Sequence, residues 1–245
     1  MGIKVENLNF SYATEPVLKK INFEIEDGEF VGLTGSTGSG KTTLAFCLNG
    51  LIPNSIKGKF SGQVSIDGML TTEHKVVEIA RRVGLVFQDP DWQLFSLSVK
   101  DEVAFGLKNL KMNKIDTRVK KALKQVGLEK FIDEEPHKLS QGQKQKLCIA
   151  CVLAMEPKII ILDEPTSQLD YKNTKQIYNI LKKLNEKGKT VLAIDHNTDL
   201  LAGYADRIFI MDNGKIVKNG LTEEVFSDIK LLEKLGIKVP NSVMK

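Results

Sequence analysis

The sequence predicts an α/β fold with three parts: a parallel-sheet core, an antiparallel β subdomain at its edge, and an inserted α-helical subdomain. The core is predicted by five short apolar segments without alternation, as expected of strands buried on both faces. The edge subdomain is predicted by three alternating segments bounded by turn pairs such as Asp27-Gly28 and Asp67-Gly68. The insert is predicted by the long stretch between Gln88 and Glu156, which shows only helical periodicity.

Each element follows from the same patterns, taken in chain order. The expected edge strands are residues 3–10, 20–26 and 62–67. The expected core strands are residues 30–33, 83–87, 158–162, 190–194 and 207–211. The expected helices include 43–51 in the core and 99–107, 115–126 and 141–155 in the insert. We therefore expect a single domain over residues 1–245, with a core formed by 1–88 and 157–245 and a helical subdomain at 89–156.

The composition is that of a folded protein that does not itself cross a bilayer. Hydrophobic residues make up 42% and charged residues 27% of the 245 residues, close to globular averages. The longest apolar runs, 149–155 and 159–162, are far shorter than the roughly 18 residues of a spanning helix, and the N-terminus has no continuous apolar signal segment. We therefore expect the chain to lie in the cytoplasm.

The charge pattern gives no indication of nucleic-acid binding. The net charge is only +4, and acidic residues are interspersed with the basic ones. The most basic stretch, 108–124, has spacings that favour the solvated face of a helix over an anion site. We expect no nucleic-acid partner.

The three cysteines do not predict a disulfide framework. Cys148 and Cys151 form a C-x-x-C pattern, but they lie in an apolar helical run, where positions i and i+3 share one face. We interpret them as core residues of a helix rather than as a redox pair.

The clearest functional motif follows the expected strand 30–33. It fits the pattern G-x-x-x-x-G-K-[ST] and runs directly into the expected helix 43–51. Its glycines let backbone N–H groups turn toward one point, and the helix N-terminus adds a positive dipole end, so the loop can cradle phosphates. Lys41 would reach the β and γ phosphates, and the Thr42 hydroxyl would bind Mg²⁺. The expected nucleotide-binding residues of this segment are Gly35, Ser36, Thr37, Gly38, Ser39, Gly40, Lys41, Thr42 and Thr43.

Two carboxylates follow the expected strand 158–162. Asp163 and Glu164 would be presented at the carboxyl edge of the sheet, where ligands of open α/β sheets bind. Asp163 is suited to hold Mg²⁺ through its water shell, and Glu164 to polarise the water that attacks the γ-phosphate. Together with the phosphate loop, the pair resembles a P-loop NTPase with a RecA-like core.

A third motif identifies the family that the sequence resembles. With the two motifs above, Leu139-Ser140-Gln141-Gly142-Gln143 resembles the signature of ATP-binding cassette (ABC) ATPases, and the resemblance spans nearly the whole chain. It implies that the Ser140 hydroxyl and the Gly142 N–H face ATP held by a second ATPase subunit. Gln141 and Gln143 belong to the same nucleotide-binding segment, although Gln141 stands where the family usually has glycine.

The same resemblance assigns four further residues. Tyr12 is similar to the aromatic that stacks on adenine, and Gln88 to the glutamine that links Mg²⁺ to the partner. His196 is similar to the switch histidine at the γ-phosphate, and Asp170 to the residue of the dimer-contact loop. The expected catalytic residues are Lys41, Gln88, Glu164 and His196, and the expected metal-binding residues are Thr42, Gln88 and Asp163, with ATP and Mg²⁺ as cofactors.

The segment 86–95, followed by 101–107, resembles the ATPase subunits of energy-coupling factor transporters, which import vitamins and cobalt or nickel. In that group this segment faces a transmembrane coupling protein. The implied partners are a second ATPase subunit, an integral membrane coupling protein and a substrate-binding membrane subunit. Trp92 and Phe95 could lie on this surface or in the core of the helical subdomain.

The resemblance implies an ATP hydrolase that drives a membrane importer from the cytoplasmic face. Two other functions occur in the superfamily: action on DNA or the ribosome, and nucleotide-dependent regulation without turnover. The first would call for a long coiled coil or a second cassette, and the second for loss of the carboxylate at Glu164. The sequence encodes neither the cargo nor whether the ATPase pairs with itself or with a related chain.

Overall fold

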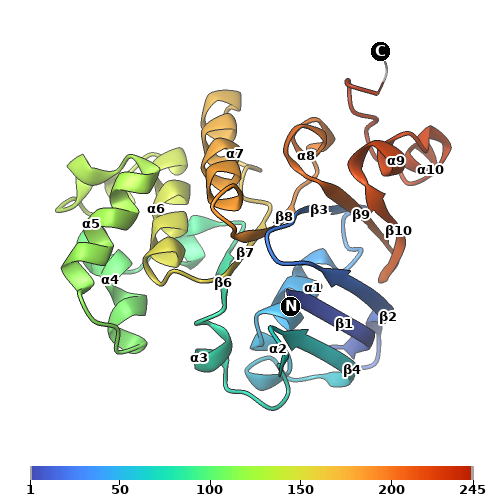
Figure 1. The fold of residues 1–245 in the computed structure, drawn as a ribbon, viewed down its shortest axis with the longest axis horizontal. Coiled ribbons are helices and arrows are strands. Elements are labelled where there is room, and N and C mark those ends of the chain that lie inside the picture. Colours follow the sequence, from blue (N-terminus) through green and yellow to red (C-terminus); the bar gives the residue numbers. More distant parts are fainter. Residues whose placement is uncertain (1, 244–245) are drawn as a thin grey trace.

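The computed structural model describes residues 2–243, in which six strands form the central sheet (Figure 1). The strand order is β10-β9-β3-β8-β7-β6; β10 is antiparallel to β9, and the other neighbours are parallel. These strands are β3 (Phe30–Gly35), β6 (Val83–Val86), β7 (Ile159–Asp163), β8 (Thr190–Ile194), β9 (Arg207–Asp212) and β10 (Lys215–Leu221). The five predicted core strands are confirmed. Strand β10 was not predicted because it is an edge strand in which apolar residues are mixed with Lys, Asn and Gly, and all of its positions are at least partly exposed.

A second sheet of four antiparallel strands, in the order β2-β1-β4-β5, packs beside the central one (Figure 1). It comprises β1 (Ile3–Ser11), β2 (Pro16–Ile25), β4 (Lys59–Ile66) and β5 (Met69–Leu70). Buried positions in β1 and β2 alternate with exposed ones over much of their length, because only one face contacts the core. The predicted edge subdomain is confirmed, with β5 as an addition.

The central sheet separates two apolar cores. Neighbouring strand residues point to opposite faces, so that Phe30 packs with the helices and Val31 with the antiparallel sheet. Helix α1 (Lys41–Leu48) lies on the side of the antiparallel sheet, and α7 (Tyr171–Asn185) on the other. The remaining helices of this part are α2 (Leu51–Asn54), α3 (Val76–Ile79), α8 (Thr198–Tyr204), α9 (Thr222–Phe226) and α10 (Ile229–Lys234).

Three further helices stand apart at one end of the molecule (Figure 1). They are α4 (Val99–Asn109), α5 (Ile115–Val126) and α6 (Gln141–Ala154), with the short 3-10 turns η1 (Pro90–Trp92), η2 (Glu129–Phe131) and η3 (Pro136–Lys138). Among the described residues, no strand occurs between β6 and β7, so the inserted α-helical subdomain is confirmed. Its bounds at 89–156 remain our proposal.

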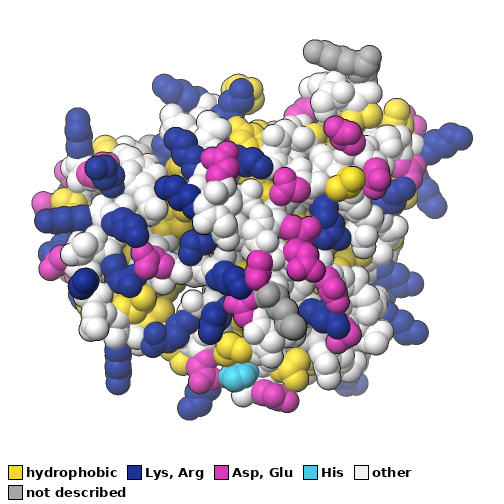
Figure 2. All heavy atoms as spheres, in the orientation of Figure 1, with side chains coloured by type: hydrophobic (Ala, Val, Ile, Leu, Met, Phe, Trp, Pro, Cys, Tyr) yellow, Lys and Arg dark blue, Asp and Glu magenta, His cyan; other side chains and the backbone are white. Residues whose placement is uncertain are grey.

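The surface has the mixed charge, and α6 the core cysteines, that the sequence predicts. Basic and acidic side chains are interspersed over the face shown in Figure 2. Lys108, Lys120 and Lys124 of the basic stretch are exposed. In α6, Cys148 is buried and Cys151 partly so, and burial raises the pKa of both thiols, which disfavours the reactive thiolates.

The described helices include none that is both long and apolar enough to span a membrane.

Candidate nucleotide-binding site

The phosphate loop connects β3 to α1, and its backbone requires glycine. Gly35 has φ +148°, and a Cβ atom there would lie 1.9 Å from the carbonyl oxygen of Met211. Gly38 and Gly40 have φ of +78° and +102°, which other residues rarely adopt. Since Gly40 precedes α1 and has no side chain, it leaves the first N–H groups of the helix uncapped, as a phosphate site requires.

Lys41 lies against the inner side of this loop. Its side chain donates hydrogen bonds to the carbonyl oxygens of Gly35 and Ser36, both at 3.0 Å, and the residue is only 5% exposed. Burial lowers the pKa of its ammonium group, and the carboxylates of Glu164 and Asp163 partly offset that effect. The chain thus holds a buried cation at the place where phosphates would enter.

Asp163 at the end of β7 has the features of a ligand to a divalent cation. It is 3% exposed, and its Oδ1 has no hydrogen-bond partner among the described residues. Burial raises the pKa of its carboxyl group, and a hydrogen bond from the Thr42 hydroxyl partly offsets this rise. An unpartnered buried oxygen beside a hydroxyl fits Mg²⁺, which prefers oxygen ligands. Residues 2–243 contain no group of three or more His, Cys, Asp or Glu side chains placed to hold a metal ion.

Three segments converge on Glu164. Gln88 follows β6 and donates from Nε2 to Glu164 Oε2 at 3.0 Å. His196 follows β8, and its Nε2 lies 2.8 Å from Glu164 Oε1. Glu164 itself has φ +48°, and its N–H donates to the carbonyl oxygen of Ile194 on β8 at 2.9 Å. The order β8-β7-β6 therefore brings the three predicted residues together at the carboxyl edge of the sheet.

The phosphate loop and these side chains form one open cleft. Its lining residues are Val17, Thr37, Gly38, Gly40, Lys41, Thr42, Thr43, Gln88, Glu164 and His196. Tyr12 lies beside it, because its hydroxyl is 3.1 Å from the Thr43 hydroxyl and its ring packs edge-on against Phe10. The tyrosine is 47% exposed, so ring surface remains available for a base.

The predicted signature residues form a second group. Ser140 caps α6: its N–H donates to Gln143 Oε1 at 2.8 Å, and its hydroxyl accepts from the Gln143 N–H. Gln141 donates to Gln168 at 2.8 Å. A Cβ atom on Gly142 would lie 2.8 Å from the side chain of Asn173, so glycine permits close packing on α7.

Asp170 caps α7 by accepting from the Asn173 N–H at 2.7 Å. The signature segment and Asp170 therefore lie together near the start of α7. Among the described residues that line the phosphate-loop cleft, none belongs to this second group.

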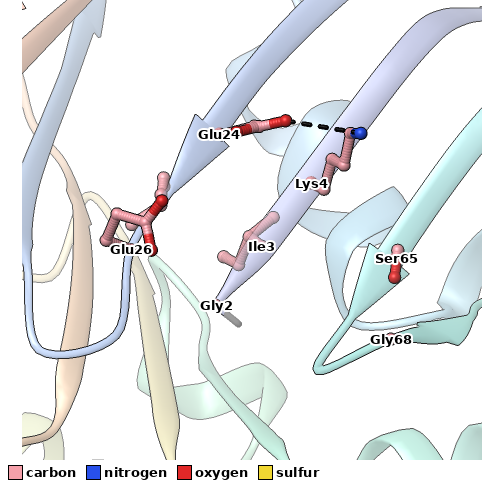
Figure 3. A pocket seen from close by; sticks show the side chains of 8 residues that line it. Gly2, Ile3, Lys4, Glu24, Glu26, Ser65 and Gly68 are labelled. Carbon is pink, nitrogen blue, oxygen red and sulfur yellow. Dashed lines mark ion pairs between the residues drawn. The ribbon is translucent and has the colours of Figure 1, made fainter.

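Another cavity lies between the ends of β1, β2 and β4 (Figure 3). Lys4 and Glu24 form an ion pair of 3.5 Å there. Since none of the predicted site residues lines this cavity, it has no part in the nucleotide site.

Sequence reasoning missed several residues next to the site. Asp195, Thr166 and Tyr178 form a buried hydrogen-bonded cluster beside His196. The signal in the sequence was Asp195 itself, an acidic residue directly after the core strand 190–194. The exposed side chains of Leu97 and Phe105 were also missed. Phe105 lies in a helical segment, where an apolar residue is usually core, and Leu97 lies in the loop before α4.

The fold and the cleft define a nucleoside triphosphatase of the P-loop class. Residues 18–167 match the ABC transporter family model, so the chain belongs to the ABC transporter family. It is 43% identical over 243 aligned residues to the energy-coupling factor transporter ATP-binding protein EcfA of Methanocaldococcus jannaschii, which covers 97% of this chain and 85% of that protein.

Solved structures agree with this assignment. The structure of cbiO1 from Clostridium perfringens, part of the ABC transporter complex cbiONQ, matches with a TM-score of 0.82 and 37% identity over 99% of this chain and 97% of that one. A dimeric ATP-binding cassette in a post-hydrolysis state, bound to ADP and Pi, matches with a TM-score of 0.79 and 31% identity over 90% and 98%. The chain is an ATP-hydrolysing ABC subunit homologous to energy-coupling factor transporter ATPases.

Proposed function

We propose that this chain is the peripheral ATPase of an energy-coupling factor importer of a vitamin or metal ion, bound at the cytoplasmic face of the membrane. Two ATP molecules would lie between this chain and a second ATPase subunit. The importer assignment is supported by the similarity to the energy-coupling factor ATP-binding protein EcfA. One observation carries the shared ATP sites: the phosphate-loop cleft and the signature segment lie in separate places within one chain. Each site is then completed by the partner subunit.

Charge supplies the physical reason for a shared site. Lys41, the loop amides and the start of α1 can surround only one side of a triphosphate. The other side of the γ-phosphate would still present strong acceptors. The 14-residue helix α6, with its N-terminus at Ser140, offers a second positive dipole end for them.

Within the cleft, the roles follow from the contacts. Lys41 would leave its carbonyl partners for the β and γ phosphates, while Thr42 and Asp163 would hold Mg²⁺. When bound, Mg²⁺ neutralises charge on the phosphates. Glu164 would orient and polarise the attacking water, with His196 and Gln88 holding its two oxygens in place.

The membrane partner would bind an exposed apolar surface, which we define as Trp92, Phe95, Leu97 and Phe105. Trp92 is 84% and Leu97 87% exposed, and the rings of Phe95 and Phe105 meet edge to face at 4.7 Å. Exposed aromatic residues grouped in this way are typical of protein interfaces.

This surface is connected to both halves of the ATP site. It begins four residues after Gln88, whose side chain contacts Glu164. The η1 turn is tied to α6 by an ion pair of 2.7 Å between Asp91 and Lys144. A change at the γ-phosphate can therefore move Gln88, the exposed apolar surface and the signature helix together.

A mixing experiment tests the shared site, with one copy of this chain paired with another. Lys41→Ala removes phosphate binding but leaves the signature usable, whereas Ser140→Arg blocks the signature but leaves the phosphate loop. Neither variant alone should occlude ATP. Mixed together, they should form dimers with one intact site and recover about half of the wild-type occluded nucleotide per mixed dimer, since one of two sites is restored.

Cross-linking between differently tagged copies shows whether mixed dimers have formed. Mixed dimers without occluded nucleotide would rule out sharing between copies of this chain. If the chain does not self-associate, the same pair of changes is divided between it and its companion ATPase.

A further inference from the structure

A buried carboxylate beside His196 has no role in the steps above. Asp195 directly follows β8 and is buried. Its Oδ2 accepts hydrogen bonds from the Thr166 hydroxyl at 2.7 Å and from the Tyr178 hydroxyl at 2.8 Å. Its Oδ1 accepts from the backbone N–H of Asn197 at 2.9 Å. Both oxygens therefore have hydrogen-bond partners, as buried polar atoms require.

These contacts fix the backbone on both sides of His196. The bond from Asp195 Oδ1 to the Asn197 N–H closes a turn around the histidine, of the kind that Asp side chains commonly form. The Asp195 N–H donates to the carbonyl oxygen of Leu33 on β3 at 3.1 Å. His196 thus leaves the sheet in a set direction, with its Nε2 2.8 Å from Glu164.

The two hydroxyl donors come from segments that belong to the nucleotide site. Thr166 lies two residues after Glu164. Tyr178 lies on α7, the helix that Asp170 caps, and it is fully buried with its ring stacked on Phe30. The hydroxyl of such a fixed ring has little freedom, so it holds the carboxylate in one position.

We propose that Asp195 is a positioning residue for the hydrolytic reaction. Anchored by Tyr178 and Thr166, it sets the turn that aims His196 at Glu164 and at the γ-phosphate. It does not line the phosphate-loop cleft and acts only through His196. This inference rests on the proposed roles of His196 and Glu164.

The test is Tyr178→Phe, which removes one donor and keeps the ring. We expect kcat for ATP hydrolysis to fall roughly tenfold, while KM for ATP stays within about twofold because the phosphate loop is untouched. Thr166→Val, which removes the other donor at similar volume, should act in the same direction. Tyr204→Phe is the matched control, since the Tyr204 hydroxyl donates to Asn179 instead, at 2.8 Å.

A double-mutant test with His196 distinguishes a positioning role of Asp195 from a role in stability alone. In a His196→Ala background, Tyr178→Phe should lower the residual kcat no further, because the residue through which Asp195 acts is gone. An equal loss in both backgrounds would overturn the inference, as would unchanged kcat in Tyr178→Phe with a lowered melting temperature. Full turnover in His196→Ala alone would instead contradict the proposed function.

Discussion

Two regions of the molecule differ in how many partners their side chains have within the chain. One is the catalytic edge of the central sheet, and the other is the exposed apolar surface of Trp92, Phe95, Leu97 and Phe105. At the sheet edge, Glu164 has a partner for each carboxylate oxygen, and Lys41 has two carbonyl partners; Asp163 Oδ1 alone of these groups has none among the described residues. At the apolar surface, large side chains are left in water, with Trp92 and Leu97 almost fully exposed.

The two regions are suited to two kinds of function. Groups held in place by many hydrogen bonds are suited to chemistry, which depends on fixed geometry. Apolar groups left in water are suited to binding another molecule, because burial on binding is favourable. Changes at the first region should therefore alter turnover, and changes at the second should alter association.

Glu164→Gln should give the largest effect. The amide keeps the shape of the side chain but cannot accept a proton from water, so turnover should fall about 100- to 1,000-fold. Binding should survive, measured as ATP-dependent thermal stabilisation, since Lys41 and the loop amides remain. Glu129→Gln, in an exposed turn of the helical subdomain, is the control. Turnover within a few-fold of wild type would remove Glu164 from the reaction.

Two leucines of the helical subdomain sharpen the contrast between core and surface. Leu123→Ala should lower the free energy of unfolding by about 2–5 kcal/mol, because Leu123 of α5 is fully buried and truncation leaves a cavity. Leu97→Ala should change it by less than about 0.5 kcal/mol, as expected of an exposed side chain. Urea denaturation measures both. Equal losses of unfolding free energy in the two variants would mean that Leu97 stabilises the fold and is not available to a partner.

The double change Trp92→Ala with Phe95→Ala tests the apolar surface directly. Co-purification with a transmembrane coupling protein should fall at least about tenfold, since exposed aromatic residues often dominate binding energy. ATPase activity of the free subunit should stay within about twofold, because these side chains do not line the cleft. Val217→Ala with Leu221→Ala, exposed on β10, is the control. Retained binding and transport would place the coupling surface elsewhere.

Substitution of Tyr12 should give the smallest effect. It tests whether every exposed aromatic side chain takes part in binding the membrane partner. Tyr12→Ala should raise KM for ATP roughly tenfold through loss of stacking on adenine, with unchanged kcat and unchanged co-purification. Tyr12→Phe should behave like wild type, since it loses only the hydroxyl contact with Thr43. A rise in KM of equal size in both variants would show that the hydroxyl, and not the ring face, matters.

Much of the nucleotide site could be predicted because its signals are local. The phosphate loop is one continuous segment, and its need for glycine is visible in the sequence and in the positive φ angles. The five core strands were also found from short apolar runs. Strand β10 was not found because Lys218, Asn219 and Gly220 interrupt its apolar residues, and none of its positions is buried.

Contacts across the sheet could not be predicted from the sequence. The bond between Gln88 and Glu164 joins residues 76 positions apart, and it exists because β6 pairs with β7. The buried cluster of Asp195, Thr166 and Tyr178 likewise depends on how α7 packs against the sheet. No periodicity encodes such distances.

The sequence by itself determined the class of fold, the phosphate loop and the pair Asp163-Glu164, because each depends on neighbouring residues and on backbone geometry that they impose. Only the tertiary structure decided that Glu164 is held by Gln88 and His196, that the signature segment lies away from the cleft of its own chain, and that Trp92 and Leu97 remain in water. The physical reason is that strand order and helix packing bring distant side chains together or keep them apart, and these arise from burial summed over the whole chain.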